Sequence, residues 1–250
     1  MWMIILLAAI PAWGQWTNVR SPNIPRTPDG KPDLMAPLPR TDDGKPDLSG
    51  VWIVSQSFVD GVPKYMRNLA SDLSQEEAPE MQPWAAALVK ERTANLGRDA
   101  PTSRCLPPGV PRIMLMARPF EIVQTKERIL LVYEGGAHVW RQVWMDGRAH
   151  PKEPNPNWLG HSIGRWEEET LVVDTTGFND MTWLDDAGHL HTEQLHVVER
   201  FTRTSATAMK YEVTIDDPGA YTQSWTFGSS FSFYPGEKLA EDICLDKISR

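Results

Sequence analysis

The segment Gln194–Ile215, QLHVVERFTRTSATAMKYEVTI, decides the fold class of this chain. Successive side chains of a β-strand point to opposite faces of the sheet. Over Met209–Ile215 the odd-numbered residues are apolar, whereas the even-numbered residues are Lys, Glu and Thr. Over Leu195–Phe201 a similar alternation places Leu, Val, Glu and Phe on one face. Two such runs joined by a short polar segment predict antiparallel strands with one buried face.

Short apolar runs separated by turn signals fill the chain from Ser49 onward, which is typical of an all-β domain. Nine strands are expected, at Gly50–Gln56, Arg112–Met116, Phe120–Gln124, Ile129–Glu134, His138–Met145, Thr170–Thr175, Gln194–Phe201, Met209–Ile215 and Ser224–Phe233. A closed antiparallel barrel of lipocalin-like form leaves no exposed strand edge, so we expect it in preference to the alternative, a β-sandwich.

One helix is expected inside this domain, over Pro83–Leu96, PWAAALVKERTANL. Proline stands at its start, Ala and Leu fill its body, and Gly97 follows its end, as is common at helix boundaries. Because the helix interrupts the series of strands, we expect it to plug or flank one end of the sheet.

The N-terminal part divides into two segments before the barrel domain of residues 49–250. Residues 1–14 contain an apolar run too short to span a bilayer, followed by small residues, which predicts a secretory signal peptide. Residues 15–48 are rich in proline and contain RTPDGKPDL at Arg26–Leu34 and RTDDGKPDL at Arg40–Leu48. Asp-Gly and Lys-Pro pairs favour turns and extended chain, so we expect an arm that lies over the domain or trails from it.

Export predicts a periplasmic or secreted protein, in which the two cysteines, Cys105 and Cys244, meet an oxidising environment. Two cysteines in such a compartment most economically pair with each other, so a Cys105–Cys244 disulfide is expected. No later stretch approaches 18 apolar residues, the length that a membrane span requires, so no transmembrane segment is expected in the mature chain.

The amino-acid composition indicates which kinds of binding partner this protein can have. The chain carries 25 Lys and Arg against 33 Asp and Glu, a formal net charge of −8, which argues against nucleic acid because phosphate binding needs a basic patch. Hydrophobic residues make up 41% and eleven residues are Trp. These rings either pack in the core or form a stacking surface for a small molecule. The sequence leaves the oligomeric state open.

All six histidines lie within His138–His196. In the string GHLHTE the residues His189, His191 and Glu193 have the spacing of one strand face. A carboxylate beside an imidazole can transfer protons near neutral pH, so His191 and Glu193 are candidate catalytic residues. The alternative is a structural role, in which the acidic residues of this face brace neighbouring strands or arginines.

The same His-x-His-x-Glu spacing admits a metal site, with His161 or His138 as a further ligand. We rank this below proton transfer and expect no metal. The chain has neither a phosphate loop nor a dinucleotide fingerprint, so no cofactor is expected.

Further candidates gather around DTTGFND at Asp174–Asp180, which follows a predicted strand. Local turn formation is the simpler role for these residues. At the mouth of a barrel they would instead join His161 and nearby Trp side chains in a small-molecule site, which makes His161 and Asp174 additional catalytic candidates. The candidate ligand-binding residues are Trp140, Trp144, His138, Trp158, Trp183, Asn179, Glu199 and Arg141.

GHSIG at Gly160–Gly164 fits the G-x-S-x-G pattern of a nucleophile elbow. Such an elbow follows a buried strand and opens a helix, but here a turn-like NPNW precedes the motif and a strand-like run follows it. We therefore do not expect Ser162 to act as a nucleophile.

Several strings resemble those of a large family of exported bacterial proteins that begin with a DGKPDLSGVW-like segment. They include YEGGAHVWRQ at Tyr133–Gln142, GHSIGRWE at Gly160–Glu167, TLVVDTTGFND at Thr170–Asp180 and HTEQLHVVERF at His191–Phe201. The resemblance implies that His161, His191 and Glu193 are shared within the family, and that His189 is not. It implies no particular activity.

Three functions follow from these patterns. The first is an exported β-barrel that holds an apolar, aromatic or sugar-like ligand in a Trp-lined cavity. The second is a cofactor-free lyase, hydratase or isomerase that uses the His191 and Glu193 pair in the same cavity. The third is an envelope interaction module tethered by its Pro-rich arm.

Overall fold

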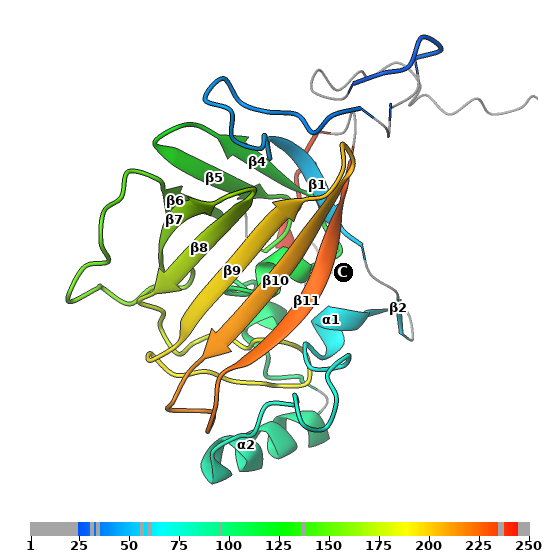
Figure 1. The fold of residues 1–250 in the computed structure, drawn as a ribbon. Coiled ribbons are helices and arrows are strands. Elements are labelled where there is room, and N and C mark those ends of the chain that lie inside the picture. The colour runs from blue at the N-terminus through cyan, green and yellow to red at the C-terminus, as the bar shows by residue number, and fades with distance from the viewer. Residues whose placement is uncertain are drawn as a thin grey trace, which may run out of the picture.

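The computed structural model describes residues 25–30, 33, 36–55, 58–59, 62–95, 97–136, 139–234 and 238–244. Nine strands form a closed barrel in the order β1-β11-β10-β9-β8-β7-β6-β5-β4, which confirms the predicted all-β barrel (Figure 1). They are β1 Gly50–Val54, β4 Phe120–Gln124, β5 Arg128–Tyr133, β6 Trp140–Trp144, β7 His161–Glu167, β8 Thr170–Thr176, β9 His196–Arg203, β10 Ala208–Asp216 and β11 Trp225–Phe233.

An odd number of strands cannot alternate in direction all the way around a closed barrel. One neighbouring pair must therefore run parallel, and this pair is β6 and β7. It is joined by only two register partners, Val143 with Ser162 and Trp144 with Ile163, whereas β7 and β8 share seven. The antiparallel expectation holds for the other eight pairs, and the barrel wall is weakest at this seam.

The strand prediction was wrong at two places in the barrel, and it also missed the short strands at Phe58–Val59 and Val62–Pro63. Arg112–Met116, expected as a strand, contains the 3-10 helix η3, Arg112–Leu115. All four residues of η3 are buried, including the charged Arg112, and a buried run this short has no periodicity that separates strand from helix. Strand β7 was missed because its inward positions are Ser162, Gly164 and Trp166, so it lacks a regular apolar alternation.

The barrel interior is filled mainly by aromatic and aliphatic side chains. Met209, Tyr211, Val213 and Ile215 are all fully buried, as the alternation of β10 predicts. Tyr211 packs against Phe201 and Phe231, with ring centroids 4.9 Å apart in both cases. The face pattern of β6 also agrees with its sequence, since Arg141 and Val143 point inward. The interior is therefore a packed core around a few polar groups.

Both copies of the duplicated arm motif form the same local turn. Arg26 donates to the carbonyl of Gly30 as Arg40 donates to that of Gly44, and in each copy the glycine N–H donates to the threonine carbonyl three residues earlier. Only part of the first copy is described. The second copy lies against the barrel, where Leu48 is fully buried and Arg40 forms an ion pair with Glu169.

The remaining elements lie outside the barrel wall or close its ends. The expected helix is present as α2, Pro83–Ala94, and packs at one end of the barrel (Figure 1). Four short elements precede or follow it: β2 Phe58–Val59 pairs with β3 Val62–Pro63, α1 spans Lys64–Arg67 and η2 spans Pro101–Arg104. Among the described residues, no helix has the length and apolar character needed to cross a membrane.

The predicted disulfide between Cys105 and Cys244 is confirmed. It links the segment after η2 to the C-terminal segment that follows β11. The backbone N–H of Ala240 also donates to the buried carboxylate of Glu134, 2.9 Å away, so a hydrogen bond supports the same attachment.

We expect the Cys105→Ala/Cys244→Ala double variant to have a free energy of unfolding about 5 kcal/mol below that of the wild type. The physical reason is the 139-residue separation of the two cysteines, because a cross-link over a long loop strongly restricts the unfolded chain. Urea denaturation of both proteins measures the difference. Equal midpoints would contradict the expectation.

Candidate functional site

A cleft of about 480 Å³ opens at the seam between β6 and β7. Here the two strands have diverged beyond their two paired positions, so no backbone ladder closes the wall. The cleft is lined by Pro107, Val139, Trp140, Arg141, Gln142, Trp144, Asn157, Trp158, Leu159, Gly160, His161 and Ser162. Apart from Pro107, which follows η2, and Val139, which precedes β6, these residues come from β6, from the start of β7 and from the connection that joins them. Five candidates from the sequence, Trp140, Trp144, Trp158, Arg141 and His161, therefore meet in one cleft.

Three indole rings give the cleft its apolar surface. Trp140 is 59% exposed, an unusual amount for a side chain of that size. The Trp144 ring carries the Arg148 guanidinium 3.5 Å above its centroid, and Trp158 is half-buried. Indole surfaces that stay accessible beside a concave wall are suited to stacking against a flat ligand ring.

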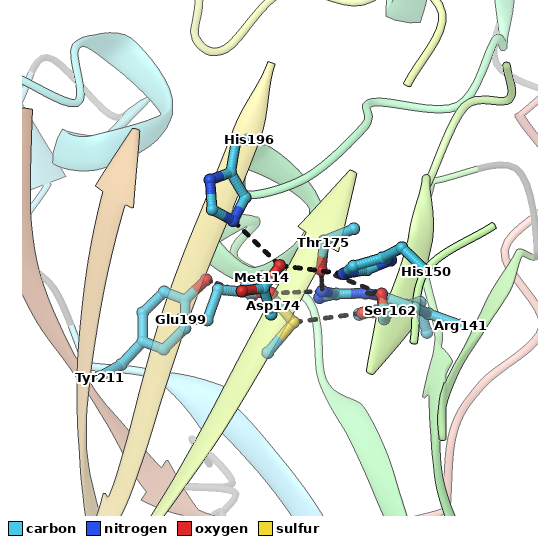
Figure 2. Close-up of polar contacts among 10 residues, drawn as sticks. Met114, Arg141, His150, Ser162, Asp174, Thr175, His196, Glu199 and Tyr211 are labelled. Carbon is cyan, nitrogen blue, oxygen red and sulfur yellow. Dashed lines mark hydrogen bonds and ion pairs between the residues drawn. The ribbon is translucent and has the colours of Figure 1, made fainter. Parts of the chain in front are cut away.

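Below the cleft lies a buried polar network inside the barrel (Figure 2). The guanidinium of Arg141 forms an ion pair with Glu199, and both side chains are almost completely buried. Arg141 Nε donates to the Ser162 hydroxyl at 2.9 Å, and Nη2 donates to that of Thr175 at 2.7 Å. Glu199 accepts the Tyr211 hydroxyl at 2.7 Å. These contacts correspond to the bracing role considered for the acidic residues of β9.

The surroundings of Arg141 and Tyr211 set the protonation states of these two side chains. Burial disfavours the charged guanidinium of Arg141, but the charge and hydrogen bonds of Glu199 outweigh it and raise the pKa of Arg141. Burial also raises the pKa of Tyr211 well above its ordinary value, and the Glu199 charge adds to this effect. Arg141 therefore keeps its positive charge at ordinary pH, next to the Glu199 carboxylate.

Two nitrogen atoms in the cleft lining are buried yet have no hydrogen-bond partner among the described residues. They are Nη1 of Arg141 and Nε2 of Gln142. A buried donor without a partner costs about 1–3 kcal/mol, and most buried donors in proteins are satisfied. Both residues lie on β6, with Arg141 on its inward face and Gln142 on its outward face, so one unpartnered donor lies on each side of the wall beside the cleft.

On the outer face of the barrel, the Asp174 carboxylate accepts hydrogen bonds from two imidazoles. His150 Nε2 lies 3.0 Å and His196 Nε2 lies 2.9 Å from the same carboxylate oxygen, Oδ1 (Figure 2). His150 Nδ1 lies 2.9 Å from Nδ1 of His161, which lines the cleft. A continuous hydrogen-bonded path therefore joins the cleft to Asp174 through His150.

The pKa shifts along this path follow from its contacts. The hydrogen bond from His196 lowers the pKa of Asp174, and the same bond raises the pKa of His196. Partial burial lowers the pKa of His161, and the nearby His150 and Arg148 act in the same direction. Asp174 is therefore ionised and His161 neutral near pH 7.

Gly160 explains how the chain brings His161 to this position. Its backbone has a φ of +67°, in the left-handed region that favours glycine. A Cβ atom there would lie 2.7 Å from a methyl group of Thr175 and 2.8 Å from the carbonyl of Thr176. Any other residue would push the start of β7 away from β8 and displace His161.

The structure does not bring His191 and Glu193 together. Residues 189–193 precede β9 and lie in a loop, so strand alternation does not govern them. His191 is buried: its Nδ1 donates to the Thr192 carbonyl, and its Nε2 accepts from the Thr182 hydroxyl at 2.6 Å. Glu193 is exposed, and His189 is held by the buried carboxylate of Asp185 at 2.6 Å.

Three other candidates lie away from the cleft or cannot be placed. Trp183 is buried beneath Arg92, whose guanidinium lies 4.3 Å from the ring centroid. Asn179 accepts the backbone N–H of Met181, a turn-forming contact that agrees with the simpler reading of this segment. His138 lies outside the described residues.

His150 and Gln142 are site residues that the sequence reading did not select. The clustering of all histidines in one part of the chain was the signal for His150. Nothing in its immediate sequence, GRAHPK, marks it, because its role depends on how the connection between β6 and β7 folds back. Within the described part of the chain, no group of three or more His, Cys, Asp or Glu side chains is arranged to hold a metal ion.

Comparison with protein-family models, with curated proteins and with solved structures finds no match for this chain. The assignment of a function therefore depends on the geometry of the site.

We expect Glu199→Leu to lower the free energy of unfolding by about 3–5 kcal/mol, because it leaves the buried Arg141 guanidinium without its counter-charge. The double variant Arg141→Met/Glu199→Leu removes both charges and is expected to recover at least half of that loss. Urea denaturation of the three proteins measures both effects. A single variant as stable as the wild type would show that the ion pair does not support the barrel.

The buried His191 is expected to make the folded protein less stable in acid. Burial lowers its pKa in the folded state, so below about pH 6.5, the ordinary value of a histidine, the unfolded chain takes up the proton more readily. The decrease in melting temperature from pH 7 to pH 5 is expected to be smaller for His191→Gln than for the wild type.

His196 provides a control of opposite sign. Its raised pKa contributes stability that is present below its ordinary pKa and is lost as the pH rises through the raised value. His196→Gln should therefore lower stability more at pH 5 than at pH 8. The same pH dependence in both variants would contradict the assigned environments.

Proposed function

We propose that this protein is an exported small-molecule-binding β-barrel whose ligand lies in the cleft at the β6–β7 seam. The observation that carries the proposal is the combination of two unpartnered buried donors, on Arg141 and Gln142, with three indole side chains lining one cleft. The cleft volume falls within the range of about 300–1,000 Å³ typical of small-molecule sites.

The chemistry of the cleft favours a neutral ligand. Arg141 is already paired with Glu199, so the guanidinium offers a donor but no uncompensated positive charge. Gln142 also offers a neutral amide donor. A flat ring that carries uncharged oxygen acceptors, such as an aromatic carbonyl or nitro compound or a sugar ring, can accept from one of these donors while it stacks on the indoles.

Export to the periplasm or the cell exterior is part of the proposal. The apolar segment at residues 1–14 has the features of a signal peptide, and the Cys105–Cys244 disulfide suits an oxidising compartment. The envelope-module alternative has no specific observation in its favour, and the catalytic alternative built on His191 and Glu193 lacks the contact that it requires.

Trp140→Ala is expected to weaken ligand binding at least about tenfold, a loss of about 1.4 kcal/mol, because the most exposed stacking surface of the cleft is removed. The probe is 3-methyl-5-nitrobenzisoxazole, a flat neutral ring with oxygen acceptors, and isothermal titration calorimetry measures its affinity. The matched control is Trp84→Ala. Trp84 is 49% exposed on α2 and is not among the residues of the cleft, so its removal should leave the affinity unchanged.

Native mass spectrometry of protein purified from its own host provides the complementary test. A retained neutral compound in the wild type that is lost in Trp140→Ala would support the proposal. A failure of the wild type to bind the probe, together with no retained compound, would overturn it.

A further inference from the structure

His161 has two properties that are not needed for binding a ligand in the cleft. It lines the cleft, and its ring nitrogen Nε2 has no partner among the residues that the structure describes. Its other ring nitrogen lies at the start of the path through His150 to Asp174. A binding wall needs no such path, because an indole or amide side chain would serve equally well.

We propose that His161 is the acid–base residue of the cleft, positioned and charged through His150 by Asp174, and that the protein removes a proton from a neutral ring compound bound there. The substrate class is a flat ring with an acidic C–H next to a C=N or C=O group. This inference rests on the proposed function, because the same cleft must first bind the ring.

The hydrogen bonds fix the tautomers of both imidazoles. A carboxylate only accepts, so His150 Nε2 carries the proton that faces Asp174. The Nδ1 atom of neutral His150 is then an acceptor, and it receives the Nδ1–H of His161. The Nε2 atom of neutral His161 is left with a free electron pair. This is the form that a general base requires.

A proton that His161 takes up from the substrate can be accommodated along the same path. When Nε2 of His161 accepts a proton, its Nδ1–H can pass to Nδ1 of His150. The positive charge then lies on His150, within hydrogen-bond distance of the ionised Asp174. The electron pair of the broken C–H bond remains with the substrate and expels a leaving group or shifts a double bond. No oxidant, reductant or cofactor enters this balance.

The charged and titratable groups around His161 come from three elements. His150 and Arg148 lie on the connection between β6 and β7, Asp174 lies on β8, and His196 lies on β9. Arg148 and His150 lower the pKa of His161 together with its partial burial, so the base is unprotonated at neutral pH. The Asp174 carboxylate, hydrogen-bonded to His150 Nε2, places a negative charge at the far end of the path, which favours proton uptake at its cleft end.

The test uses 5-nitrobenzisoxazole, in which a base removes the C3 proton while the N–O bond breaks to give a cyanophenolate. We expect wild-type protein to exceed the buffer rate and His161→Ala to lower kcat/KM at least about 100-fold. Asp174→Asn should lower kcat at least about tenfold and move the pH profile to lower pH, since the charge that supports His150 is lost. Trp84→Ala should keep the wild-type rate.

Binding of the 3-methyl analogue separates failure of this inference from failure of the proposed function, because that analogue has no C3 proton to lose. His161→Ala should still bind it, which shows that the variant is folded. Wild-type protein that binds the analogue but does not accelerate the elimination would overturn the acid–base role alone. A rate that is lost in Glu193→Gln rather than in His161→Ala would also overturn it. If neither compound binds, both proposals fail.

Discussion

The odd number of strands is the constraint on which the rest of this structure depends. Nine strands close into a barrel only if one neighbouring pair is parallel, and a parallel pair requires a connection that returns along the full length of the strand. Residues 145–160 make that return, and Figure 1 shows this connection extending away from the barrel wall between β6 and β7. The same connection carries His150, Asn157 and Trp158, so the closure of the barrel also builds the cleft.

The alternation of side chains lets each strand at the seam serve two purposes. On β7, His161 faces the outer path while Ser162 faces the buried network, and on β8 the adjacent residues Asp174 and Thr175 divide in the same way. The inner contacts hold the wall in place where the backbone ladder is shortest. The outer contacts place the titratable groups of the proposed acid–base path at the same position, so this path lies directly outside the rigid inner network.

The sequence predicted the features that depend on local periodicity and chemistry. The alternation in β9 and β10, the helix at α2 and the disulfide were all recoverable, because each follows from spacing or from residue type. The predicted number of strands equals the number in the barrel, but only because the false strand at residues 112–116 offset the missed β7. The site was less predictable: His161 and three Trp residues were selected, whereas the contacts of His150 depend on a parallel pairing that no local pattern encodes.

A crystal structure of the protein with 3-methyl-5-nitrobenzisoxazole tests the central claim most directly. The account predicts that the ring stacks on an indole of the seam cleft and that one of its oxygen atoms lies within about 3.2 Å of Arg141 Nη1 or Gln142 Nε2. A ring bound elsewhere, or a seam in which protein groups already satisfy both nitrogen atoms, would contradict the account.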